Sequence, residues 1–504
     1  MVKGRFILFC CVLLTACSTP DSDSIRFGLA SAPTNLDPRF ATDAASERIN
    51  RLLYNRLVDF DEHARPRPAL ASWERLNDRH YRFRLGTAGR RFHDGSRLDA
   101  ADVAATYRSV LDPATASPQR GTLAMIEHIE VLDRDTLDFF LNRADALFPG
   151  FLTIGILPAA GIEAGRAFHH QPMGSGPFRL RSWPAPGRLE LERTRDRQII
   201  VFEQVHDPTM RVLKLLRGEV DILQNDLPPE LLHYLAGKKG IYVRTHRGSN
   251  FSYLGFQLQD RDTGKEDVRR AIALAIDRRA IIRYVFRGAA RPASALLVPE
   301  HWAGNPHLDS IETDLDRART LLARAGYDAD HPLHIRYKTS SDPFRVRIAT
   351  ILQQQLGRVG ILVDVQSYDW GTFYADIKAG RFQLYSLTWV GIKSPDIFRY
   401  AFHSDSLPPG GANRGRLQDA RIDRMIEQAM VAKDTQQQAK IYAALQARLL
   451  EQLVYVPLWY EDQYLAARDG ISGYSLATDG NYDALQSISK NRYTIAQRGL
   501  QDAR

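Results

Sequence analysis

Hydrophobic and polar positions alternate with two different periods along the first part of the chain. Residues 81–85 alternate with the two-residue period of a strand with one buried face, and 25–30 also predict a strand. Between these strands, apolar residues recur at three- and four-residue spacing from 49 to 57, which predicts a helix. Another helix is predicted from Asp99, whose carboxylate can cap its first turn while Asp102 completes a capping box.

Strand and helix patterns alternate most clearly between residues 333 and 389. The predicted strands are 333–337, 361–365 and 384–389, and the predicted helices are 344–359 and 369–380. This order implies parallel strands that are joined by right-handed crossovers. The sequence therefore predicts an α/β fold with a parallel sheet in this region.

Three aromatic residues follow the ends of successive predicted strands in that region. Parallel sheets bind ligands beyond the carboxyl ends of their strands, so Tyr368, Trp370 and Trp389 are expected near one crevice. A place in the hydrophobic core is the alternative for any one of these rings. Two tryptophans at successive strand ends favour the crevice.

The first residues have a different character. Lys3 and Arg5 precede nine apolar residues, and the segment ends in Leu-Thr-Ala-Cys at Cys17. This is the layout of a secretory signal with the cleavage and acylation pattern of bacterial lipoproteins. A membrane-spanning anchor or a buried core helix is the alternative, but a transmembrane helix needs about 20 apolar residues. We therefore expect a signal peptide over 1–16, lipid on Cys17 and a short polar tether over 17–23.

Composition fits a globular body on that tether. The chain is 44% hydrophobic and 25% charged, and the cysteines other than Cys17 lie in the predicted signal, so no disulfide is expected. The net charge is +8, but Lys and Arg are scattered in ones and twos. We therefore expect no nucleic-acid partner. Contact with anionic envelope surfaces or an acidic ligand explains the charge better.

Several short motifs occur in an order that resembles one protein family. They lie at residues 53–58, 81–85, 92–96, 173–178, 216–222 and 268–278. Together they resemble the extracytoplasmic solute-binding proteins of peptide and nickel ABC importers. The resemblance covers nearly all of the chain after the predicted signal.

This resemblance implies a two-lobed periplasmic-binding-protein clamp of type II with an additional inserted domain. The implied divisions are lobe I over 24–45, 172–265 and 472–504, the inserted domain over 46–171, and lobe II over 266–471. The lobes are expected to close on the ligand. Only a ligand that touches both lobes can favour the closed state.

The resemblance also implies ligand-binding positions. In peptide-binding relatives, loops of both lobes pair with the ligand backbone, a form of strand addition. The matching positions here are Thr42, Asp43 and Ala44 on one side and Thr388, Trp389, Val390 and Gly391 on the other.

One position departs from the pattern of those relatives. Relatives that bind a free amino terminus carry aspartate three residues after the matching tryptophan, where this chain has Ile392 and then Lys393. Asp43 or Asp396 could replace that carboxylate. Alternatively, the ligand lacks a free amine, or is acidic and meets Lys393. The sequence therefore predicts that amino-blocked or acidic peptide-like compounds bind better than free peptides.

Few residues of the sequence support a catalytic or metal-binding function. His169 and His170 lack carboxylate or cysteine partners at metal-ligand spacing. Ser175 is not in a nucleophile elbow, because a glycine directly follows it. Asp59 and Asp61 have no base or metal partner near them in sequence. We expect no enzymatic activity, no metal site and no cofactor, although nickel remains conceivable as a chelate.

The sequence thus predicts a monomeric, lipid-anchored receptor that captures a peptide or peptide-like solute. It would deliver this solute to the permease and ATPase subunits of an ABC importer, outside the cytoplasm and at the envelope membrane. One alternative is an envelope sensing or interaction protein that keeps the clamp without transport, for which Ser18 is relevant because it suits outer-membrane sorting. A nickel-chelate receptor is another.

Overall fold

The computed structural model describes residues 23–491. Cys17, the predicted signal peptide and nearly all of the predicted tether lie outside these residues. Within 23–491, no helix combines the length and the hydrophobicity needed to cross a membrane.

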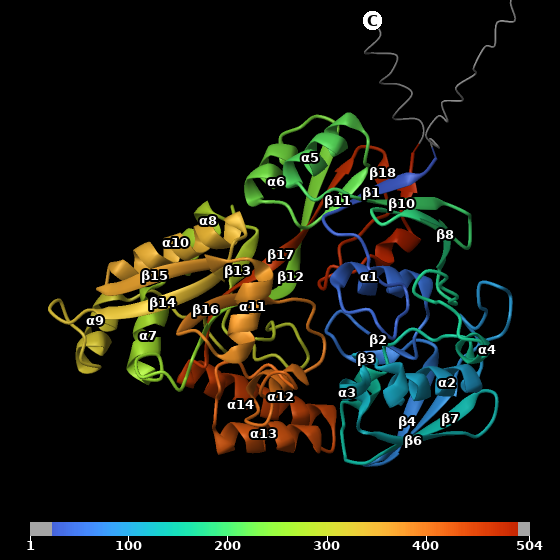
Figure 1. Cartoon of the computed structure of the whole chain (residues 1–504), viewed down its shortest axis with the longest axis horizontal. Helices are drawn as coiled ribbons and strands as arrows, with labels where there is room; N and C mark the ends of the chain where they lie inside the picture. Colours follow the sequence, from blue (N-terminus) through green and yellow to red (C-terminus); the bar gives the residue numbers. More distant parts are fainter. Residues whose placement is uncertain (1–22, 492–504) are drawn as a thin grey trace, which may run out of the picture.

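One mixed sheet of eleven strands runs through both lobes of the molecule (Figure 1). Ten strands form its main path, and β13 (Ala290–Pro292) pairs with β17 beside that path. From one edge to the other, the path is β15 (Ile361–Tyr368), β14 (Leu333–Ser340), β16 (Leu384–Trp389), β12 (Ile241–Phe256), β17 (Tyr455–Arg468), β11 (Ile222–Gln224), β1 (Ile25–Leu29), β10 (Ile199–Gln204), β9 (Arg188–Arg193) and β8 (Phe178–Ala185).

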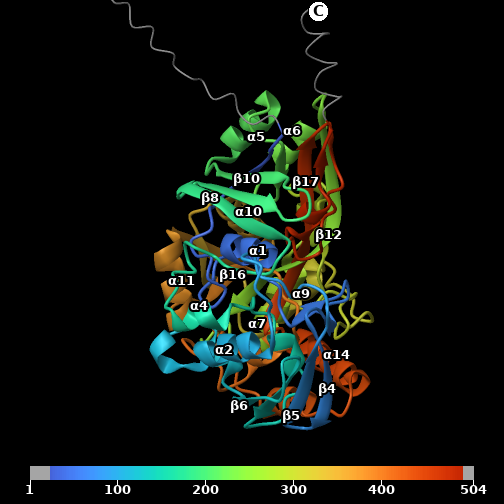
Figure 2. The same ribbon diagram turned by 90° about the vertical axis from the view of Figure 1, so that its right-hand side faces the viewer.

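Two long strands join the lobes. β12 and β17 pair with each other in antiparallel register, and their register shifts between His246 and Asn250. On one side of this shift the pair continues into β11 and β1, which we call the first lobe. On the other side it continues into β16, β14 and β15, the second lobe. Figure 2 shows β12 and β17 running side by side along the molecule.

A smaller sheet stands apart from the main one and forms a third unit. Its four strands follow the order β4 (Ala71–Asn77), β5 (His80–Leu85), β7 (Thr136–Leu141) and β6 (Ile126–Val131). Short elements around it are β2 (Val58–Phe60), β3 (Pro66–Pro68), α2 (Ala100–Leu111), η1 (Pro113–Thr115), α3 (Arg120–Leu123), η2 (Phe148–Phe151) and α4 (Ala159–Glu163). Its buried hydrophobic core uses only residues from 57 to 156.

Helices cover the two lobes. The first lobe has α1 (Ala44–Leu53), α5 (Pro208–Arg217), α6 (Pro229–Ala236), η3 (Asp483–Gln486), and the small pair β18 (Ile471–Ser472) and β19 (Ser489–Lys490). The second lobe has α7 (Glu266–Ala275), α8 (Arg278–Tyr284), α9 (Leu315–Arg324), α10 (Pro343–Gly357), α11 (Trp370–Ala379), α12 (Ile397–Phe402), α13 (Ala420–Met430) and α14 (Thr435–Gln452).

Aspartate starts many of these helices. Its side chain accepts a hydrogen bond from a backbone N–H of the first turn, which would otherwise lack a partner. Asp99 caps α2, and Asp102 closes the predicted capping box. The same capping is made by Asp43, Asp207, Asp277, Asp314, Asp342, Asp369, Asp419 and Asp434.

The predicted α/β class and two-lobed clamp are confirmed. β14 pairs in parallel with both β15 and β16, as the alternating pattern implied. The domain divisions stay a prediction. α1 begins just before the predicted inserted domain, but its Ile49, Leu52 and Leu53 pack in the core of the first lobe.

Candidate ligand-binding cleft

The amphipathic helix α1 supplies one wall of the cleft. Ile49, Leu52 and Leu53 are completely buried in the first-lobe core. Because a helix turns every 3.6 residues, Glu47 and Arg51 lie on the other side, where they line a cavity. The apolar stripe thus anchors the helix and turns its charged side chains toward the ligand space.

Asp43 holds this helix in place. Its carboxylate accepts hydrogen bonds from the backbone N–H of Ser46 at 2.8 Å and from Thr34 Oγ1 at 2.7 Å. The Ser46 hydroxyl also donates to it. Burial opposes ionisation, but these hydrogen bonds outweigh it and lower the pKa of Asp43. Asp43 is therefore a helix cap rather than a free carboxylate in the cleft.

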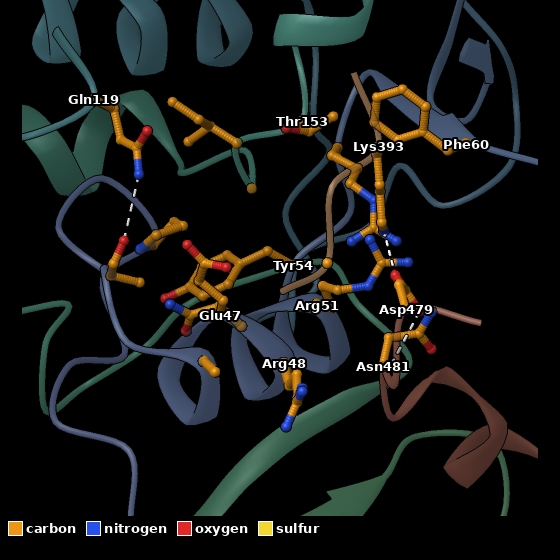
Figure 3. A pocket seen from close by; sticks show the side chains of 18 of the residues that line it. Glu47, Arg48, Arg51, Tyr54, Phe60, Gln119, Thr153, Lys393, Asp479 and Asn481 are labelled. Carbon is orange, nitrogen blue, oxygen red and sulfur yellow. Dashed lines mark hydrogen bonds and ion pairs between the residues drawn. The ribbon is translucent and has the colours of Figure 1, made fainter. Parts of the chain in front are cut away.

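The first cavity has a volume of about 540 Å³ and is built by all parts of the molecule (Figure 3). Its walls come from α1, loops beside the four-stranded sheet, the loop after β16 and the C-terminal segment of the first lobe. Among the lining residues are Thr42, Ala44, Glu47, Arg48, Arg51, Phe60, Gln119, Thr153, Val390, Gly391, Lys393, Asp479 and Asn481. Such a volume is typical of a site for a small molecule.

An ion-pair network neutralises most of the cationic charge there. Arg51 pairs with Asp483 and Asp59, and Arg56 pairs with Asp59 at 3.0 Å. Burial opposes ionisation of Asp59, but Arg56 and Arg51 hold its pKa far below the ordinary range. These guanidinium groups therefore have carboxylate partners from the protein itself.

Lys393 also has a partner, and this one crosses the cleft. Its Nζ lies 2.5 Å from Asp479 Oδ2, so the second lobe is joined to the first (Figure 3). Burial raises the pKa of Asp479, but the charge and hydrogen bond of Lys393 outweigh it and lower the pKa. Phe60 lies beneath the ammonium, with its ring centre 5.7 Å from Nζ. This ion pair therefore connects the two lobes across the cleft.

A second cavity of about 680 Å³ lies beyond this ion pair. It shares Arg51, Phe60, Lys393, Asp479 and Asn481 with the first cavity, so these side chains form a partition. His301 contacts the main chain of Lys393, one of the partition residues. Ala303 N donates to its Nδ1 at 3.0 Å, so Nε2 carries the proton and donates to the Lys393 carbonyl at 2.9 Å. Burial lowers the pKa of His301 to about 4, and the ring is neutral at pH 7.

A third, smaller pocket of about 190 Å³ lies at the carboxyl ends of β14 and β16 in the second lobe. Trp370, Thr388 and Val390 line it, together with Ser340 and Ser386. Val390 also lines the first cavity, so the pocket adjoins the ligand space. This is the place where the parallel strands predicted a crevice.

The structure separates the residues predicted from sequence into three groups. Thr42, Ala44, Val390, Gly391 and Lys393 line the first cavity, and Trp370, Thr388 and Val390 line the small pocket. Tyr368 and Trp389 instead pack partly buried against a hydrophobic core of the second lobe. Asp43 caps α1, and Asp396 lies at the start of α12 outside the three cavities.

Asp396 lies in a buried environment outside the three cavities. Burial raises its pKa, and its charge in turn adds to the burial that raises the pKa of Asp145 to about 6. The two charges thus interact in the region where the segment after β7 meets the second lobe, in which the Ala146 N–H donates to the carbonyl of Met430. A role in this contact explains Asp396 better than ligand binding.

Sequence reasoning missed the charged face of α1 and the C-terminal segment. Glu47, Arg48 and Arg51 could have been found, because they lie opposite the apolar stripe that predicted the helix. No local pattern marked Gln119, Asp479 or Asn481.

Comparison with known proteins decides the family. The model for "Bacterial extracellular solute-binding proteins, family 5 Middle" matches residues 64–407. This chain belongs to that family. The family 5 chain is 24% identical to heme-binding protein A of Haemophilus influenzae, with 94% of each chain covered. It is 25% identical to the dipeptide-binding protein of Pseudomonas aeruginosa, covering 90% of this chain and 93% of that protein.

Solved structures share the fold of this family 5 protein. NikZ from Campylobacter jejuni, in complex with Ni(L-His), superposes with a TM-score of 0.79 at 22% identity, covering 93% of this chain and 99% of NikZ. Family 5 consists of extracytoplasmic binding proteins of transporters, so the prediction of a binding protein rather than an enzyme is confirmed. Within residues 23–491, no group of three His, Cys, Asp or Glu side chains could hold a metal ion.

Proposed function

We propose that this protein is the lipid-anchored substrate-binding component of an ABC importer, and that it captures a peptide or peptide-like solute between its lobes. It would then deliver the solute to the permease and ATPase subunits as a monomer. The observation that carries this proposal is the first cavity, whose walls come from both lobes. A ligand in that cavity contacts both lobes and so favours their closure.

The chemistry of the cavity supports a peptide-like ligand. Val390 and Gly391 bring an irregular segment of main chain to the wall, and Gln119 and Asn481 add amide groups. Such groups suit hydrogen bonds to a ligand backbone and demand little of its side chains. Relatives at 25% to 27% identity are named dipeptide- and di/tripeptide-binding proteins, which supports the same class of ligand.

The test is to identify what the protein carries. The full chain is purified from membranes without refolding, and native mass spectrometry measures any bound small molecule before and after denaturation. We expect a released mass in the range of a small peptide, and uptake of that compound by cells that express this protein together with its ABC permease and ATPase subunits. A nickel chelate would favour the alternative receptor. Ligand binding without uptake would favour an envelope sensor.

The anchor has its own test. Changing Cys17 to Ser removes the only cysteine that remains after the predicted cleavage, and with it the thiol for lipid attachment. We expect the variant to lack lipid mass and either to leave the membrane fraction or to keep its signal peptide. Fractionation followed by intact-mass analysis measures this. Equal membrane retention with an unchanged mass would contradict the lipid assignment.

A further inference from the structure

Some charged side chains of the first cavity have partners among residues 23–491, and one does not. Arg51, Arg56, Lys393 and Asp479 all take part in ion pairs within the protein. Arg48 packs its guanidinium over the Tyr482 ring, 5.4 Å from the ring centre. The Glu47 carboxylate makes no ion pair or side-chain hydrogen bond with any residue between 23 and 491. Its side chain is nevertheless in the cavity wall.

The cations near Glu47 make their close contacts with other side chains, although their charges act on its carboxylate. Figure 3 shows Glu47 away from the Lys393–Asp479 pair, while Arg48 points in another direction along α1. Lys393 and Arg51 are occupied by Asp479 and by Asp483 and Asp59. Among the described residues that line the first cavity, Glu47 is therefore the carboxylate that is open to a ligand.

The surroundings of this carboxylate favour a cation. Burial raises the pKa of Glu47, and the neighbouring charge of Asp43 raises it further. The charges of Lys393, Arg48 and Arg51 lower it in part, but the pKa of Glu47 stays raised, so its negative charge is not fully compensated. A ligand ammonium would compensate it and gain a charge-assisted hydrogen bond. An acidic ligand group would add to the negative charge instead.

We propose that Glu47 binds the ammonium group of the ligand, and that the natural ligands are therefore peptides or peptide-like solutes with a free amine. This inference rests on the proposed peptide-binding function. It replaces the preference for amino-blocked or acidic ligands that Ile392 suggested. Asp43 and Asp396 cannot take this role as they stand, because one caps α1 and the other lies outside the cavity. Lys393 is not free to attract an acidic ligand.

The experiment uses the full chain with two probes: an equimolar library of di- to tetrapeptides, and the same library after acetylation of its amino termini. Native mass spectrometry compares bound fractions. We expect the wild-type protein to prefer the free library at least tenfold. Glu47→Gln should lose most of that preference through weaker binding of free peptides, with acetylated peptides changing less than twofold. Glu47→Asp should keep part of it.

Glu62→Gln is the matched control. Glu62 is a carboxylate on the second cavity, beyond the partition, and its side chain is 86% exposed. The Glu62→Gln variant should keep the wild-type preference for free peptides. All variants should unfold at the same temperature, because the Glu47 side chain makes no contacts within residues 23–491 that stabilise the fold. If the wild type binds both libraries equally, or Glu47→Gln keeps the full preference, the inference is wrong while peptide binding stands. If neither library binds, the proposed peptide function itself fails.

Discussion

Gly174→Ala is expected to destabilise the protein by about 3 kcal/mol or more, because a Cβ at this position has no space. It would lie 2.0 Å from the carbonyl oxygen of Leu53 and 2.8 Å from the carbonyl carbon. Both atoms belong to the main chain at the end of α1, so no side-chain rotation can relieve the contact. Urea denaturation followed by circular dichroism measures the loss in free energy of unfolding.

This substitution should also weaken ligand binding, because the loop it belongs to positions α1. The N–H of Gly176 donates to the carbonyl of Leu53 at 2.9 Å, and Gly174 accepts from His93 N–H at 2.9 Å. A shift of Leu53 would move Glu47 and Arg51 on the same helix. The motif at residues 173–178, recognised first as a family resemblance, thus has a physical role in supporting the cleft.

Gly357→Ala is the control for this prediction. Gly357 is the last residue of α10, and an added Cβ there meets nothing within 4 Å. Alanine restricts the unfolded chain more than glycine does, so we expect no loss and a gain of up to about 1 kcal/mol. Similar stability of Gly174→Ala and Gly357→Ala would contradict the close packing between the loop and α1.

The elements were predictable where their signal is local. The parallel strands β14, β15 and β16 and the helices between them follow from periodicity and caps within about 60 residues. The cavity has no such signal. Gln119, Lys393 and Asp479 come from distant parts of the chain, and only the tertiary fold brings them together. The ion pair of the cleft likewise joins Lys393 and Asp479, which are far apart in the sequence.

Asp43 shows that a residue matched from a family pattern can have a structural use that the sequence does not distinguish from ligand binding. An aspartate just before a helix can bind a ligand or cap the helix, and the two uses compete for the same oxygen atoms. The N–H of Ser46 and the hydroxyl of Thr34 occupy them here. Glu47, in the first turn of the same helix, has no such local partner, so its carboxylate is left to the cavity.

The tryptophans predicted to bind ligand are expected to differ in their main effect. Trp389 lies opposite Phe251 on β12, packs against a second-lobe core and holds the Arg414 guanidinium 4.8 Å from its ring centre. Trp370 is 59% exposed and stacks on Tyr374 with ring centres 5.3 Å apart. Only Trp370 lines one of the three cavities of the cleft.

Trp389→Ala should therefore destabilise the fold by about 2 to 4 kcal/mol, since it removes a large packed ring and leaves a cavity. Trp370→Ala should cost less than about 1 kcal/mol in stability, because most of its ring already faces solvent. Urea denaturation gives the free energy of unfolding of each variant, and calorimetry with the identified ligand gives the loss in affinity. If Trp389→Ala binds ligand weakly but keeps its stability, the ring contacts the ligand directly, as the strand pattern predicted. Its packing against the core would then contribute little to the free energy of unfolding.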